Sequence, residues 1–192
     1  MAGSAGAPVW RVVLDANILL QAPIRDTLLR LAEARVLLVF WSAEILAEVA
    51  RNFATVSGSA GAPRRLTTLL AALEAHFPGA TMHGYESMLP TLLIAPHDRH
   101  VLGCALVAGA RIIVTYNTRD FPARLLADTG VQAWHPDTLL CTVLHHRPVE
   151  LRRIVTDQGG QMHPPRPLVQ MLDRLAQDVP QFVAEARLAF DR

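Results

Sequence analysis

The chain has 192 residues, of which 51% are hydrophobic and 18% are charged, and its formal net charge is +1 at pH 7. These values exclude a disordered chain and indicate one folded domain with room for a helical appendage. All 18 basic residues are arginine, which excludes lysine-dependent chemistry such as the phosphate-binding loop and Schiff-base catalysis.

Three features predict a cytoplasmic protein without a membrane segment. Residues 1–10 are mostly small, so we expect a flexible N-terminus, and they lack the basic region of a signal peptide. The apolar runs are far shorter than the roughly 20 residues of a membrane-spanning helix. Cys104 and Cys141 lie in apolar helical runs, which predicts buried, reduced thiols.

The first half of the chain alternates between predicted strands and helices. Ser42 is a good helix N-cap, because its hydroxyl can accept a hydrogen bond from a free N–H in the first turn. The predicted elements are a strand at 11–14, a helix at 24–34, a strand at 36–40, a helix after Ser42, a linker at 57–63, an amphipathic helix at 64–77 and an irregular segment at 80–95.

The stretch 96–122 predicts helix, turn, strand and acidic loop. Asp98 precedes an apolar helical run, Gly109 ends it, and the β-branched run 112–114 is typical of a buried parallel strand. A short helix at 121–128, a strand at 131–134 and a helix at 136–145 follow. We therefore predict an α/β domain over 11–146 and a helical C-terminal extension over 147–192.

Acidic and amide side chains follow several of these elements. Carboxyl ends of neighbouring parallel strands meet at one rim, where ligands bind in open α/β sheets. Oxygen ligands favour Mg²⁺ or Mn²⁺ over zinc, and a bound divalent ion can activate water for phosphoryl chemistry. The candidates are Asp15, Asn17, Glu48, Asp98, Asn117 and Asp120.

Each candidate also has a purely structural interpretation. Asp15 and Asp98 can be helix N-caps, Glu44 and Glu48 can form a solvated helix face, and Asp120 can stabilise a turn. No histidine has a zinc-ligand spacing, so we interpret His97, His100, His145 and His146 as surface or partly buried polar residues. For Arg99, Arg111, Arg119 and Arg124, phosphate contacts and local ion pairs are equally good interpretations.

The chain resembles the PIN-domain family of Mg²⁺-dependent ribonucleases over about residues 11–145. The matching segments are VVLDANILL at 12–20, SAEILAEVARNF at 42–53, PHDRHVLGCALVAGARIIVTYNTRDFP at 96–122 and HPDTLL at 135–140. The resemblance implies a three-layer α/β/α PIN-like fold with a central, mainly parallel sheet. The tail is similar to the C-terminal extension of one subgroup of VapC-type toxins.

The resemblance also implies roles for individual residues. Asp15, Glu48, Asp98 and Asp120 would be the catalytic, metal-binding acids, with Glu44 a weaker candidate than Glu48. Asn17, Thr115 and Asn117 would support them, and Arg99 and Arg119 would contact RNA. Asn117 stands where many relatives carry an acid, and His97 where a second acid often precedes the matched Asp98.

We therefore expect a Mg²⁺- or Mn²⁺-dependent endoribonuclease that is the toxin of a type II toxin–antitoxin pair. By resemblance it would bind a cognate antitoxin protein and form a homodimer. The alternative is a catalytically silent PIN-like module that binds RNA or a protein partner. A receiver-type signalling domain also has an acidic Mg²⁺ pocket, but that family needs a lysine that this chain lacks.

Overall fold

The computed structural model describes residues 8–58 and 60–190 of the chain. At its centre is a five-stranded sheet with the order β3-β2-β1-β4-β5, in which every neighbouring pair is parallel. The strands are β1 (Trp10–Leu14), β2 (Leu37–Ser42), β3 (Thr81–Met82), β4 (Ile112–Val114) and β5 (Gln132–Trp134).

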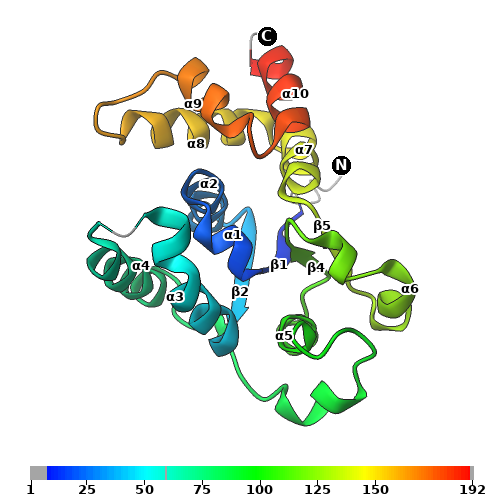
Figure 1. The fold of residues 1–192 in the computed structure, drawn as a ribbon. Coiled ribbons are helices and arrows are strands. Elements are labelled where there is room, and N and C mark those ends of the chain that lie inside the picture. Colours follow the sequence, from blue (N-terminus) through cyan, green and yellow to red (C-terminus); the bar gives the residue numbers. More distant parts are fainter. Residues whose placement is uncertain (1–7, 59, 191–192) are drawn as a thin grey trace.

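Helices cover both faces of this sheet (Figure 1). Helix α5 packs on β1, β2 and β4, whereas α2 packs on β2 from the opposite face. The helices of the first part are α1 (Ala16–Leu20), α2 (Ala22–Glu33), α3 (Ala43–Ser57), α4 (Ala62–His76), α5 (Arg99–Ala108), α6 (Ala123–Leu126) and α7 (Pro136–His146), with 3₁₀ turns η1 (Glu86–Thr91), η2 (Thr118–Asp120) and η3 (Ala127–Thr129). The α/β class and the three-layer PIN-like arrangement are confirmed.

Strand β1 is the centre of the core. Its residues Val12, Val13 and Leu14 are fully buried, as β-branched and leucine side chains are in a sheet covered on both faces. Leu14 lies opposite Val114 of β4, and Val13 lies opposite Phe40 of β2. This register brings the carboxyl ends of three neighbouring strands to one edge of the sheet.

Local signals in the sequence set the helix ends that matter for this edge. The hydroxyl of Ser42 accepts a hydrogen bond from the Ile45 N–H at 3.0 Å and caps α3. Gly109 ends α5 in the left-handed conformation, with φ of 59°, which a residue without a Cβ adopts at little cost. Both assignments agree with the sequence-based prediction.

Helix α1 and strand β3 are short elements that were not predicted. Helix α1 spans five residues, too few to show a helical repeat of apolar positions, and Asp15 caps it. Strand β3 has two residues within the segment expected to be irregular, and it joins the sheet by pairing with β2. Residues 1–7 of the expected flexible N-terminus lie outside the described residues, and Trp10 already belongs to β1.

The predicted C-terminal helices are present and pack on the first part of the chain. They are α8 (Pro148–Gly160), α9 (Leu168–Leu175) and α10 (Pro180–Phe190). Helix α8 packs against α2, and α10 packs against α7 (Figure 1). At the first contact, the buried Thr27 hydroxyl lies 2.7 Å from Gln158 Oε1. None of the helices in the described ranges has the length and apolar character that a membrane crossing requires.

Candidate metal centre

The predicted acids come from four separate segments of the chain and surround the carboxyl ends of β1 and β4. Asp15 directly follows β1, and Asp120 belongs to the η2 turn after β4. Glu48 lies on α3, and Asp98 immediately precedes α5. Because these elements meet at the rim of a parallel sheet, they form an acidic site where α/β proteins bind ligands.

Asp15 is the most firmly held of the four acids. Its Oδ1 accepts a hydrogen bond from the Ala16 N–H, and its Oδ2 accepts from Asn17 Nδ2 and Thr115 Oγ1, each at 2.7 Å. Asn17 Oδ1 in turn accepts from the Tyr116 N–H at 3.1 Å. Asn17 and Thr115 therefore orient the carboxylate and connect the ends of β1 and β4.

The electrostatic state of Asp15 follows from this environment. Burial raises the pKa of its carboxyl above the ordinary value. The hydrogen bonds from Thr115 and Ala16 lower the pKa, the carboxylate of Glu48 raises it further, and His100 lowers it. A buried carboxylate close to a second carboxylate is costly to ionise unless a cation compensates the charge.

Asp98 occupies the N-cap position of α5, yet its side chain makes no capping hydrogen bond. Its side chain is 15% exposed, and its Oδ2 is buried without a hydrogen-bond partner among the described residues, although His97 Nε2 lies 3.2 Å away. Desolvation raises the pKa of Asp98; His97 lowers it, and the carboxylates of Asp120 and Asp15 raise it. The interpretation of Asp98 as a simple cap does not hold.

Glu44 and Glu48 have different environments although they lie one turn apart on α3. Glu48 Oε1 lies 3.2 Å from His100 Nε2 and 4.0 Å from an Arg51 guanidinium nitrogen. Glu44 instead accepts a short hydrogen bond from the Tyr85 hydroxyl. The Glu48 carboxylate raises the pKa of Asp15, so we assign Glu48 rather than the Tyr85-bound Glu44 to the site.

His100 was the main site residue that sequence reasoning missed. It is 8% exposed, not on the surface, and its Nδ1 lies 3.1 Å from Ser42 Oγ. The signal was its position in the run HVLGCA, every residue of which is buried. A histidine inside such a run needs polar partners, and the sequence does not identify them.

The polar residues after β4 are the exposed part of the site. Asn117, Arg119 and Asp120 are all exposed, and Asp120 lies close enough to Asp98 to raise the pKa of that carboxyl. Arg99 is half-buried, and its Nε donates to the Ile94 carbonyl at 3.2 Å. Arg119 is therefore more open to a ligand than Arg99.

The donor set fits a hard divalent cation. All four acids offer oxygen ligands, and Asp98 Oδ2, which is buried and has no hydrogen-bond partner within the described ranges, is an atom that a cation would satisfy. In residues 8–58 and 60–190, no three His, Cys, Asp or Glu side chains already lie close enough to hold one ion together. Coordination would thus require side-chain rotation, which the exposed Asp120 and half-buried Glu48 permit.

Thiol chemistry does not contribute to this site. Cys104 and Cys141 are buried and unpaired, as predicted. Burial raises the pKa of each thiol to about 12, so neither supplies a thiolate at neutral pH.

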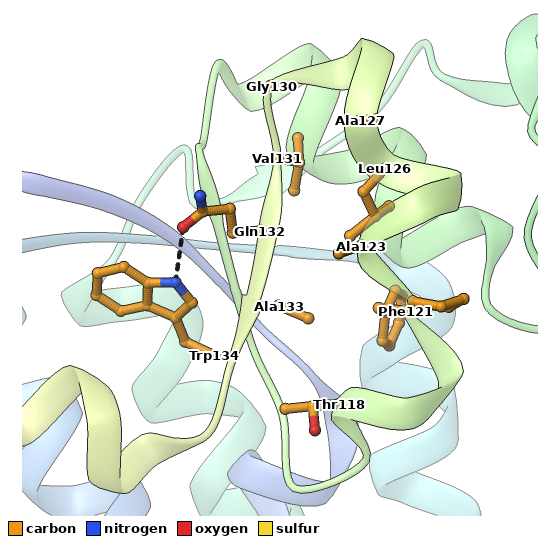
Figure 2. A pocket seen from close by; sticks show the side chains of 11 residues that line it. Thr118, Phe121, Ala123, Leu126, Ala127, Gly130, Val131, Gln132, Ala133 and Trp134 are labelled. Atoms are coloured by element: carbon orange, nitrogen blue, oxygen red, sulfur yellow. Dashed lines mark hydrogen bonds between the residues drawn. The ribbon is translucent and has the colours of Figure 1, made fainter.

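A cavity of about 480 Å³ lies next to the η2 turn, between α6 and β5 (Figure 2). Thr118, Phe121, Leu126 and Ala133 contribute to its lining, and none of the four acids does. The side chains of Gln132 and Trp134 are hydrogen-bonded to each other at 3.0 Å on the side of β5 away from α6. This mainly apolar cavity is thus separate from the acidic site.

Comparisons with known proteins agree with this geometry. The PIN domain family matches residues 11–119. The chain is 31% identical over 135 residues to "Putative ribonuclease VapC50" of Mycobacterium tuberculosis, and the match covers 70% of this chain and 73% of that protein. No solved structure matches the chain. The chain therefore belongs to the PIN-domain family and is a VapC-type member of it.

Proposed function

We propose that the chain is a Mg²⁺-dependent endoribonuclease, with Mn²⁺ as an alternative ion, and the toxin of a type II toxin–antitoxin pair. One observation carries the proposal: acids from four distant segments gather at one rim, where Asp98 Oδ2 is buried without a hydrogen-bond partner in residues 8–58 and 60–190. Such a cluster is unfavourable unless it binds a cation. The similarity to a protein named as a ribonuclease supports the choice of RNA as substrate.

In this proposal Asp15, Glu48, Asp98 and Asp120 hold the ion. A divalent ion bound there supplies an activated water and stabilises charge on the scissile phosphate. Thr115 and Asn17 keep the Asp15 carboxylate oriented through bonds of 2.7 Å to its Oδ2. The exposed Asn117 and Arg119 contact the RNA backbone at the mouth of the site, and Arg99 contributes a positive charge from α5.

The proposed partners follow from the family. A VapC-type protein implies a cognate antitoxin that holds the nuclease inactive and an RNA substrate that the free toxin cleaves. A cytoplasmic homodimer is part of the same proposal. Sedimentation of the purified protein at several concentrations would measure the dimer directly.

The test is cleavage of total cellular RNA by purified, antitoxin-free protein with Mg²⁺, with Mn²⁺ or with a chelator. We expect cleavage only with metal, and a loss of at least about 100-fold in the Asp15→Asn variant, since one acid of a metal site is removed. Asp128→Asn is the matched control, because Asp128 is an exposed acid in η3. Cleavage that persists in the chelator or in Asp15→Asn would overturn the assignment.

A specific observation favours the alternative of a catalytically silent module. His97 Nε2 lies 3.2 Å from Asp98 Oδ2, the oxygen that a metal ion would need. A silent module would retain RNA or a protein partner and cut no RNA at any divalent-ion concentration. The same assay, combined with an RNA-binding measurement on folded protein, separates the two functions.

A further inference from the structure

His100 connects three elements around the acidic site. It lies in the first turn of α5, two residues after Asp98, and is 8% exposed. Its Nδ1 is 3.1 Å from Ser42 Oγ at the end of β2, and its Nε2 is 3.2 Å from Glu48 Oε1 on α3. One imidazole ring therefore contacts the polar end of a strand and a carboxylate of the site.

The hydrogen bonds around Ser42 define how this ring is held. Ser42 Oγ already accepts a hydrogen bond from the Ile45 N–H at 3.0 Å. Its own hydroxyl can then donate to Nδ1 whenever that nitrogen carries no proton, and in that tautomer Nε2 carries the ring proton that faces Glu48. Both ring nitrogens thus have partners of complementary character.

The contact with His100 restricts the side-chain rotamer of Glu48 more than the position of Glu48 on α3 does. A glutamate side chain is long, and Glu48 is 31% exposed, so it would otherwise sample several rotamers. The bond from His100 engages Oε1, which leaves Oε2 as the oxygen for a cation. Groups that hydrogen-bond a metal-binding carboxylate commonly fix its orientation and raise the metal affinity.

We propose that His100 is a positioning residue that, anchored by Ser42, holds the Glu48 carboxylate toward the acidic rim. This inference rests on the proposed metal-dependent function. The start of α5 then has two tasks: Asp98 provides an oxygen ligand, and His100 orients a second ligand on another helix. A histidine that merely fills the core would need no bond to Glu48.

Two amide variants test the bond itself. In His100→Gln the amide reaches about as far as Nε2 and can still donate to Glu48, whereas the shorter side chain of His100→Asn reaches only the Ser42 end. Mn²⁺ binding to the metal-free protein, followed by the electron paramagnetic resonance signal of free Mn²⁺, reports affinity without RNA. We expect His100→Asn to weaken Mn²⁺ binding by about 10- to 100-fold and His100→Gln to stay within a few-fold of wild type.

A double-mutant cycle separates positioning from general destabilisation. If His100 acts through Glu48, His100→Asn should cost no further Mn²⁺ affinity in a Glu48→Gln background. Thr27→Val is the structural control: Thr27 is fully buried and hydrogen-bonded to Gln158 at the contact between α2 and α8, and it touches none of the four acids in the described hydrogen bonds, so the variant should lower stability without changing Mn²⁺ affinity.

Equal Mn²⁺ affinity in both amide variants, whether unchanged or equally reduced, would overturn the role of His100. An additive loss in the cycle would do the same. If wild-type protein neither bound Mn²⁺ nor cleaved RNA, the proposed function would fail instead. The two failures are therefore distinguishable.

Discussion

Asp15 and Asp98, the two least exposed aspartates of the site, are stabilised to very different extents. Asp15 receives hydrogen bonds from the backbone of Ala16 and from the side chains of Asn17 and Thr115, which offset part of its desolvation. Asp98 Oδ2 is buried with no hydrogen-bond partner in the described part of the chain, and desolvation raises the pKa of Asp98, which His97 lowers and the neighbouring acids raise further. The metal-free fold thus carries an unfavourable charge at Asp98 that a cation would relieve.

Replacing Asp98 should stabilise the metal-free protein at neutral pH. Because the pKa of Asp98 is raised in the folded protein, the folded state binds the carboxyl proton more tightly than the unfolded state does. The folded protein therefore loses stability as the pH rises above 3.8, the ordinary pKa of an aspartate. Asp98→Asn removes this cost. We expect a melting temperature higher by on the order of 2 °C at pH 7.5 in chelator, with the gain fading as the pH falls toward 4.

Thermal melts in chelator between pH 4 and 8 check this prediction, with Asp128→Asn as an exposed control. Addition of Mn²⁺ should reverse the order, because wild type gains stability from the ion and the variant does not. A variant that melts below wild type in chelator at pH 7.5 would mean that the Asp98 carboxylate has favourable contacts an amide cannot replace.

At the residue scale, the sequence predicts acids at the carboxyl ends of the strands, but it does not predict what surrounds them. Asp15, Glu48 and Asp98 could be located because each adjoins a strand or a helix with a clear pattern. The contact of His100 with Ser42 and Glu48 could not, because it joins residues 58 and 52 positions apart. Side-chain pairing over such separations depends on how the helices pack together. That packing cannot be predicted from the pattern of a single sequence.

Among the helices, α8 shows most clearly how close packing determines which residue a position can hold. A Cβ placed on Gly159 would lie 2.5 Å from the Arg166 carbonyl oxygen, which is rigid backbone. The Gly159 carbonyl also accepts a hydrogen bond from the Arg166 N–H at 2.9 Å. Gly159 is therefore required where the chain turns back after α8.

The Gly159→Ala variant should lower the free energy of unfolding by about 2 kcal/mol, because the backbone must move to admit the methyl group. Gly160→Ala is the matched control: a Cβ there meets nothing within 4 Å. Urea denaturation of both variants measures the difference. Equal stabilities would show that the segment between α8 and α9 adapts without cost.

Elements with a long repeat or a clear end signal could be predicted, and those without one could not. Helix α5 has both an apolar run and Gly109, and its bounds agree closely with the prediction. Strand β3 has only two residues, which are too few to show the alternation of apolar and polar side chains that marks a strand. It forms because it pairs with β2. Tertiary pairing, rather than local propensity, determines such elements.

For the molecule as a whole, the C-terminal helices pack on α2 and α7, which themselves pack on the sheet. Gln158 is 5% exposed, and its Nε2 donates to the Pro23 carbonyl of α2 at 3.0 Å. Helix α10 adds a second contact, since the N–H groups of Gln181 and Phe182 donate to Asp137 of α7. These contacts link α8 and α10 to helices that pack on the sheet.

We predict a single unfolding transition for both parts. All three tryptophans, Trp10, Trp41 and Trp134, precede the extension, so fluorescence reports on the sheet while far-UV circular dichroism also includes α8 to α10. The two urea curves should coincide. Gln158→Leu should lower both midpoints together and reduce the free energy of unfolding by about 1 kcal/mol, the typical value of a lost hydrogen bond. Separate midpoints would show that the extension unfolds independently.

The parallel sheet also determines when the acidic site can first exist during synthesis. The hydrogen bond between Asp15 and Thr115 joins residues 100 positions apart, and β1 lies between β2 and the much later β4. Until β4 and Asp120 have emerged from the ribosome, β1 lacks one of its two neighbouring strands and the rim lacks one carboxylate. Under the proposed function, truncated translation products that end before β4 should therefore be inert, and an antitoxin would be needed only once this late strand has joined the sheet.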